Sequence, residues 1–175
     1  MKDHRHYFAD ETLKDGTKVT IRAIRASDAP AILAAFGQLD RESIYRRFFT
    51  PKKQLSDGEL KQLTDVDFQQ VTALVVTMER DGAETLVGGG RFAAGDQAES
   101  AELAFLTATD FRGRGVARLI LRHLIMLARK DGIMRFEADV LAENSPMLDV
   151  FKRSGLATTQ KRDGSVVHLK LELPR

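Results

Sequence analysis

The chain has 175 residues, of which 43% are hydrophobic and 30% charged, the balance of a soluble globular protein with one sizeable core. Its 27 basic and 25 acidic residues nearly cancel, so charge gives no argument for a nucleic-acid or membrane partner. The lack of cysteine excludes disulfides, thiolate metal sites and a cysteine nucleophile, and it fits a cytoplasmic location. No run approaches the roughly 18 apolar residues of a spanning helix, and residues 1–8 lack the apolar region of a signal peptide. We therefore expect one domain over residues 1–175, with its core at about 17–173 and a flexible start at 1–7.

Four dipeptides of Asp and Gly lie between strand-like runs and predict tight turns. They are Asp15-Gly16, Asp81-Gly82, Gly95-Asp96 and Asp163-Gly164. The first predicts a hairpin of strands 8–13 and 17–24. The next two join strands 71–79, 85–92 and 99–107 into an antiparallel meander, and the last joins two C-terminal strands.

Three helical stretches are predicted between the hairpin and the meander. Ser27 is expected to cap the first, with Pro30 in its first turn. Ser56 and Glu59 have the spacing of a capping box at the start of the third. The second has one apolar face, made of Ile44, Tyr45, Phe48 and Phe49.

The segment 110–117, which reads D-F-R-G-R-G-V-A, has the pattern of a phosphate-binding loop before an amphipathic helix at 116–130. Glycine lets the backbone approach a ligand, and the first N–H groups of a helix point outward without an intrahelical partner. Arg112 and Arg114 add positive charge. The loop lacks the Lys-Ser or Lys-Thr of a P-loop, and Arg118 replaces the third small residue of a dinucleotide loop. A tight turn without a ligand is the alternative.

The strand before this loop, the helix and the strand after it predict a parallel strand pair. The helix is expected to end at Gly132, and an alternating strand at 134–140 and a helix at 146–154 follow. Within the meander, Gly88-Gly89-Gly90 predicts a bulge or the close approach of another backbone. The fold class is therefore α/β (α+β), with a mixed, mostly antiparallel sheet.

The loop and the segments on either side of it resemble the GNAT N-acetyltransferase superfamily. Arg112-x-x-Gly115-x-Ala117 is similar to the R/Q-x-x-G-x-G/A acyl-CoA loop of that family, and residues 101–105 look like its fourth strand. Residues 140–144, with Met147, Phe151, Gly155 and Leu156, look like its fifth strand and following helix. Residues 47–49 and 63–68 are similar to the catalytic domain of bacterial Pat-type protein lysine acetyltransferases. The resemblance covers about 17–173 and implies a GNAT-like sheet with a splayed parallel strand pair, flanked by helices.

The resemblance also implies acetyl-CoA as the acyl donor. The backbone N–H groups that would hold its pyrophosphate are those of Arg112, Gly113, Arg114, Gly115, Val116 and Ala117. The strand edge at Phe105, Leu106 and Thr107 would pair with the pantetheine arm, and a backbone N–H near Leu106 would stabilise the oxyanion. Asn144 would contact the same arm. Its alternative role is a helix cap, which Ser145 before Pro146 disfavours because that serine is itself a good cap.

Glu102 is the candidate catalytic residue. It is a charge inside an otherwise apolar strand, on the same face as Ala104 and Leu106. An amine is protonated at neutral pH, so the transfer needs a general base. The alternative is a surface glutamate paired with a lysine or arginine. Phe151 stands where many GNAT enzymes have a tyrosine as general acid, so no general acid is assigned and Phe151 is expected to pack against the pantetheine arm or in the core.

We therefore expect direct transfer of acetyl to a primary amine, and the Pat-like stretches favour a protein lysine. A small-molecule amine and a non-catalytic CoA-sensing domain are the alternatives. No His/Asp/Glu cluster has metal-ligand spacing, so no metal is predicted. His123 is expected on the surface, and His4 and His6 in a disordered terminus. The oligomeric state, including a homodimer, is left open.

Overall fold

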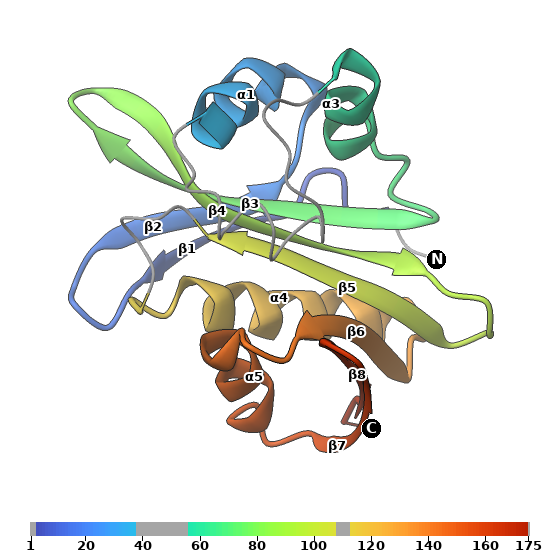
Figure 1. Ribbon diagram of the computed structural model, residues 1–175. Coiled ribbons are helices and arrows are strands. Elements are labelled where there is room, and N and C mark those ends of the chain that lie inside the picture. Colours follow the sequence, from blue (N-terminus) through green and yellow to red (C-terminus); the bar gives the residue numbers. More distant parts are fainter. Residues whose placement is uncertain (1–2, 38–55, 108–112, 175) are drawn as a thin grey trace.

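The described residues of the protein form one mixed sheet with helices on both faces (Figure 1). The computed structural model describes residues 3–37, 56–107 and 113–174. The elements in chain order are β1 (Phe8–Thr12), β2 (Lys18–Ala23), a 3-10 turn η1 (Ala26–Asp28), α1 (Ala29–Gly37), α3 (Asp57–Thr64), β3 (Val71–Arg80), β4 (Ala83–Ala94), β5 (Ser100–Thr107), α4 (Val116–Lys130), β6 (Arg135–Leu141), α5 (Ser145–Lys152), β7 (Ala157–Asp163) and β8 (Val166–Glu172).

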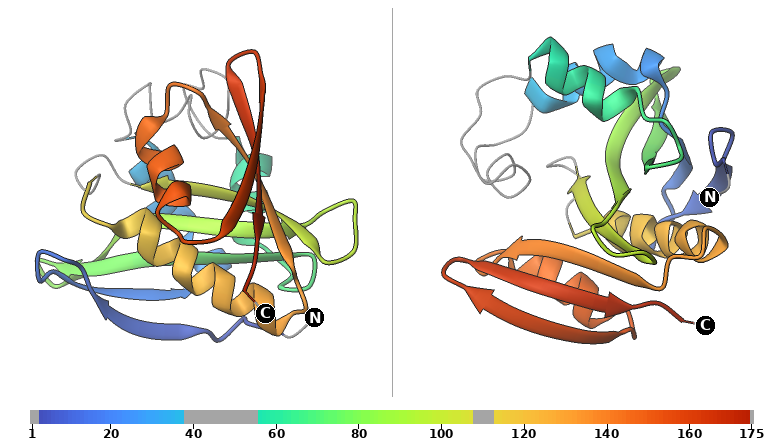
Figure 2. Two further views of the ribbon diagram at one scale, coloured as in Figure 1. Left: turned by 90° about the horizontal axis from the view of Figure 1, so that it is seen from below. Right: turned by 90° about the vertical axis from the view of Figure 1, so that its right-hand side faces the viewer.

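The strands are ordered β1-β2-β3-β4-β5-β6-β8-β7 across the sheet. Every neighbouring pair is antiparallel except β5 and β6, which are parallel. This arrangement confirms the predicted fold class, and the four Asp/Gly turns lie where they were expected. The parallel pairing covers only three residue pairs, from Ser100↔Arg135 to Glu102↔Glu137. Beyond Glu102 the two strands diverge, as the right-hand view of Figure 2 shows.

Two apolar layers hold the helices to the sheet. The larger core lies between the sheet and α4 and α5, where Ile120, Leu124 and Phe136 have no solvent exposure. A smaller cluster around Phe68 and Val75 lies on the opposite face, the face that α1 and α3 cover in Figure 1. Because side chains alternate along a strand, α4 covers one face of β3 to β5, and α1 and α3 cover the other.

The glycine triplet of β4 lets α4 lie directly against the sheet. A Cβ on Gly88 would lie 2.8 Å from Val116 Cγ1, and one on Gly90 would lie 2.5 Å from Ile120 Cγ2. The predicted bulge is also present, because Val76 pairs with Gly88 while Thr77 pairs with Leu86. The element that approaches the glycines closely is therefore α4, and their lack of side chains sets how near the helix lies to β4.

The N-terminal segment is attached to α4 by two histidines. His4 is buried and its Nε2 lies 2.8 Å from Asp131 Oδ1, so the structure differs here from the disordered start we expected. His123 is 5% exposed, and the prediction of a surface position is wrong. Its Nδ1 bonds to the hydroxyl of Tyr7 and its Nε2 lies 2.7 Å from Glu11 Oε1. Strand β1 covers the polar side of α4, which helical periodicity alone assigns to solvent.

The first helical region begins differently from the prediction. Ser27 lies inside the 3-10 turn and does not cap it. The carboxylate of Asp28 instead accepts a hydrogen bond from the backbone N–H of Arg25 at 2.8 Å and forms two bonds with the buried guanidinium of Arg22. The capping box of Ser56 and Glu59 is confirmed. The predicted second helix, with Tyr45, lies outside the described residues.

Candidate active site

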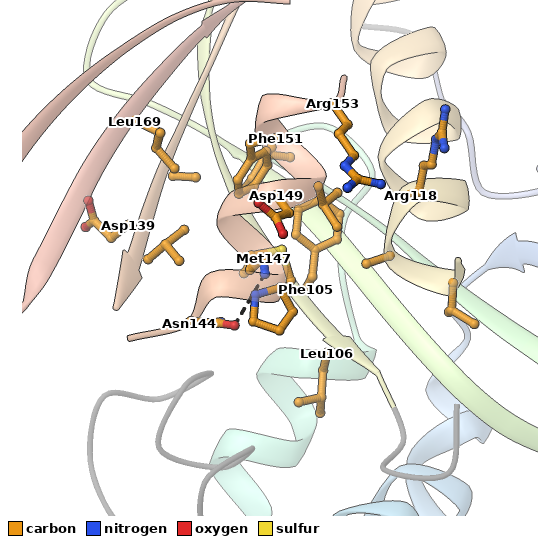
Figure 3. A pocket seen from close by; sticks show the side chains of 18 of the residues that line it. Phe105, Leu106, Arg118, Asp139, Asn144, Met147, Asp149, Phe151, Arg153 and Leu169 are labelled. Carbon is orange, nitrogen blue, oxygen red and sulfur yellow. Dashed lines mark hydrogen bonds between the residues drawn. The ribbon is translucent and has the colours of Figure 1, made fainter. Parts of the chain in front are cut away.

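A cavity of about 890 Å³ lies where β5 and β6 diverge (Figure 3). This volume is within the range of small-molecule sites. The successive residues 102–106 of β5 and 137–140 of β6 all line it. Because neighbours on a strand point to opposite faces, lining by successive residues means that the cavity passes between the strands from one face to the other.

The divergence leaves one edge of β5 without a strand partner. Residues 103–107 pair with β4 on one side, while their pairing with β6 stops at Glu102. The backbone N–H and C=O groups that this stretch of β5 turns away from β4 have no strand partner in the described part of the chain. Such an edge binds an extended ligand that carries amide groups.

The glycine loop leads into α4 at the cavity wall. Gly113 and Gly115 have φ angles of 75° and 88°, and nothing lies within 4 Å of a Cβ built on either. Glycine is therefore needed for the left-handed backbone rather than for space. Gly115 is the N-cap of α4 and supplies no side-chain cap. The first N–H groups of α4 have no intrahelical acceptor and can bind an anion, and the cavity is lined by Gly113, Gly115, Val116 and Ala117.

Glu102 lies at the point where the parallel pairing ends. Its side chain is exposed, lines the cavity, and has no ion-pair or hydrogen-bond partner within residues 3–37, 56–107 and 113–174. The alternative that it pairs with a neighbouring lysine or arginine is not what these residues show. Its register partner Glu137 also lines the cavity and accepts a hydrogen bond from the Ser100 hydroxyl at 3.1 Å.

Comparison with known proteins identifies the family. A family model described as an acetyltransferase (GNAT) domain matches residues 18–157. The chain belongs to the GNAT acetyltransferase family. It is 32% identical over 160 residues to the acetyltransferase PA5475 of Pseudomonas aeruginosa, covering 90% of this chain and 86% of that protein. The crystal structure of the GNAT domain of S. lividans PAT is 35% identical with a TM-score of 0.85, covering 95% of this chain and 97% of that one.

A further relative is the acetyltransferase Pat of Mycolicibacterium smegmatis, which is 29% identical over 163 residues. The match covers 93% of this chain and 48% of that protein, so the chain spans about half the length of this relative. These comparisons confirm the Pat-like GNAT resemblance and the prediction of an acyl-CoA-dependent N-acetyltransferase. Acetyl-CoA is the acyl donor of GNAT acetyltransferases.

Arg112 and Arg114 were expected to add positive charge to the phosphate-binding loop, and the structure shows a different role for the Arg114 side chain. Arg112 lies outside the described residues. The Arg114 side chain does not line the cavity; its Nε donates to Asp15 Oδ2 at 2.8 Å and its Nη2 to Thr17 Oγ1 at 2.7 Å. Hydrogen bonds from Thr17, and then from Arg114, lower the pKa of Asp15 to about 2. Arg114 therefore attaches the loop to the β1–β2 turn, and only its backbone N–H stays a candidate for the pyrophosphate.

Other cations line the same cavity and were not predicted. They are Lys14 in the β1–β2 turn, Arg118 in the first turn of α4, Arg153 at the end of α5 and Lys170 of β8. Figure 3 shows Arg118 and Arg153 on the side of the cavity between the two helices. The sequence around Lys14 and Arg153 could not predict their place at the cavity, because it depends on how the β1–β2 turn and α5 pack in the fold.

Asn144 has the capping role that we had disfavoured. It is the N-cap of α5, its Oδ1 accepts a hydrogen bond from the Met147 N–H at 3.4 Å, and Ser145 is already helical. Asn144 is 8% exposed and still lines the cavity, as Figure 3 shows. Its Nδ2 has no hydrogen-bond partner among the described residues, so the cap leaves a donor for the predicted contact with the cofactor arm.

Two phenylalanines form an apolar wall of the cavity. Phe105 of β5 and Phe151 of α5 have ring centroids 5.9 Å apart, and Phe151 is 1% exposed. Phe151 is thus part of the core and of the cavity wall at once. Thr107 pairs with Gly88 at the end of β5, and its side chain lies outside what is described.

The described part of the chain holds no group of three or more His, Asp or Glu side chains placed to bind a metal. None of its helices is long and apolar enough to cross a membrane.

Proposed function

We propose that this protein transfers the acetyl group of acetyl-CoA to the side-chain amine of a protein lysine. The observation that carries the proposal is the cavity that passes between β5 and β6. The glycine loop and α4 lie on one face of the sheet, and the Glu102 carboxylate lies on the other. Acetyl-CoA and the acceptor amine can therefore enter the cavity from opposite faces and meet between the strands. Holding two reactants in this way supplies much of the rate of a bimolecular transfer.

The donor side is built mainly from backbone. The N–H groups at Gly113, Gly115 and Val116 hold the pyrophosphate of acetyl-CoA, and the free edge of β5 binds the amides of the pantetheine arm. The Phe105–Phe151 wall excludes water beside the thioester. The N–H near Leu106 stabilises the oxyanion that forms during transfer.

The acceptor side depends on Glu102. Its carboxylate takes a proton from the lysine ammonium, and the neutral nitrogen then attacks the carbonyl carbon of the thioester. The tetrahedral intermediate collapses by breaking the C–S bond, and the nitrogen gives up its second proton to water, which leaves an acetylated lysine and the thiolate of CoA. A thiol has a pKa of about 8.5, so the thiolate can leave without a proton from position 151.

The test is thiol release from acetyl-CoA with a panel of lysine-containing peptides, lysine-containing proteins and small amines. We expect turnover with lysine peptides and a fall in kcat of at least roughly tenfold in Glu102→Gln, as for loss of a general base. Glu79→Gln, an exposed strand glutamate at the far end of β3, is the matched control and should keep kcat. Turnover with small amines alone would favour the small-molecule alternative. An unchanged kcat in Glu102→Gln would exclude the proposed base.

A further inference from the structure

Three charged residues form a row across the acceptor face of the sheet. Glu102 of β5 is the register partner of Glu137 of β6, which in turn is the register partner of Lys170 of β8. Paired residues on neighbouring strands point to the same face. The hydrogen bond from Ser100 to Glu137 agrees with this, because Ser100 and Glu102 lie two residues apart on one strand. All three members of the row line the cavity.

Two adjacent carboxylates are an unfavourable arrangement for a sheet. Like charges on paired positions destabilise neighbouring strands, and here the two carboxylates lie where the strands separate around the cavity. Glu137 is held in place by the Ser100 hydroxyl at 3.1 Å, and the Lys170 Nζ lies 3.9 Å from its other oxygen, at the outer limit of an ion pair. Glu102 has no such partner among the described residues. The pair therefore has a deficit of positive charge.

Two other acidic side chains of this face have side-chain partners of their own. Asp139 pairs with His168 across β6 and β8, and Glu172 pairs with Arg135 at 2.8 Å. The two adjacent glutamates at the cavity therefore carry negative charge with the sign and position that suit a cationic ligand entering from this face.

We propose that Glu137 binds the ammonium group of the acceptor and holds it against Glu102. An ammonium has three N–H donors, so it can donate to both carboxylates at once. Glu102 then accepts the proton, while Glu137 remains a hydrogen-bond acceptor and takes no part in the proton transfer. Lys170 competes with the acceptor for Glu137. This inference rests on the proposed function, because it requires an acceptor that is a cationic amine.

The experiment compares Glu137→Gln with the wild type, using acetyl-CoA and the lysine peptide that gives the highest turnover. Loss of a hydrogen bond to a charged group should raise KM for the peptide roughly tenfold, with kcat and the Kd of acetyl-CoA little changed. Glu172→Gln is the matched control, since it removes one negative charge from the same face and does not line the cavity. Lys170→Gln should lower KM, because it frees Glu137. A peptide with an aminooxy group, which is uncharged at neutral pH, should show no KM change in Glu137→Gln.

Binding of n-butylammonium to the CoA-loaded protein, followed by NMR, separates this inference from the proposed function. If Glu137→Gln weakens n-butylammonium binding roughly tenfold while no lysine peptide is acetylated, Glu137 binds amines and the protein-lysine proposal fails. If lysine peptides are acetylated and Glu137→Gln behaves like Glu172→Gln in KM and in n-butylammonium binding, the role of Glu137 is overturned. Equal KM increases for the charged and uncharged peptides would also overturn it, since a structural defect does not distinguish them.

Discussion

Replacing Gly90 by alanine tests the contact that sets the depth of α4 on the sheet. The new Cβ would lie 2.5 Å from Ile120 Cγ2 and 2.8 Å from Phe105 Cδ1, whereas carbon atoms pack best at about 3.5–4.0 Å. The helix or the side chains must therefore retreat by about 1 Å. Ile120 has no solvent exposure, so it cannot turn aside into solvent and any movement must displace neighbouring core side chains.

Overpacking of this kind costs about 1–3 kcal/mol. For a chain of 175 residues each kcal/mol lowers Tm by about 2–4 °C, so we expect Tm to fall by roughly 2–12 °C. Acetyl-CoA binding should weaken as well, because Phe105 lines the cavity and α4 carries the loop. Circular dichroism measures the loss of stability, as Tm in thermal unfolding and as the free energy of unfolding in urea. Calorimetric titration with acetyl-CoA measures the loss of affinity.

Gly58→Ala is the matched control. Gly58 lies in α3 with nothing within 4 Å of a built Cβ, so the same substitution there should stabilise the protein by about 0.4–1 kcal/mol. A double-mutant cycle gives the decisive result. Ile120→Ala alone should cost about 2–5 kcal/mol, and the double variant Gly90→Ala/Ile120→Ala should cost at least about 0.5 kcal/mol less than the sum of the single changes. Additive costs, or a Gly90→Ala variant as stable as the wild type, would refute the contact.

Two further predictions concern the buried and the exposed ion pairs. Asp15→Asn removes the carboxylate to which Arg114 is ion-paired. We expect calorimetry to give a Kd for acetyl-CoA several-fold higher and thermal unfolding to give a Tm little changed. An unchanged Kd would show that this contact does not order the loop. Although burial opposes it, hydrogen bonds from Arg22 and from the Arg25 backbone lower the pKa of Asp28, so this carboxyl binds a proton less readily in the folded than in the unfolded chain. Its contribution is therefore complete above about pH 4 and is lost as the pH falls through the lower folded-state pKa. Asp28→Asn should cost about 3 kcal/mol at neutral pH and flatten the loss of stability in acid, and equal acid slopes in urea unfolding of the two proteins would contradict this.

The sequence by itself determined most of the helices and strands and the glycine loop before α4. Turn residues and alternation depend on neighbours within a few positions, so they are readable locally, and the strand boundaries agree with the prediction to within about two residues. The R-G-R-G-V-A loop was recognised for the same reason. Its glycines are needed for positive φ angles, which are a property of the local backbone.

Tertiary structure decided the roles that depend on which strands become neighbours. Arg114 turns toward Asp15 and His123 lies beneath Tyr7 because β1 and β2 pack beside α4, about a hundred residues away in sequence. The pairing of Glu102 with Glu137 depends on the register of β5 and β6, which are separated by a loop and a helix. Alternation placed Glu102 on a face of its own strand, but only the register of β5 and β6 brought it beside Glu137 at the cavity, because long-range pairing is set by packing of the whole core.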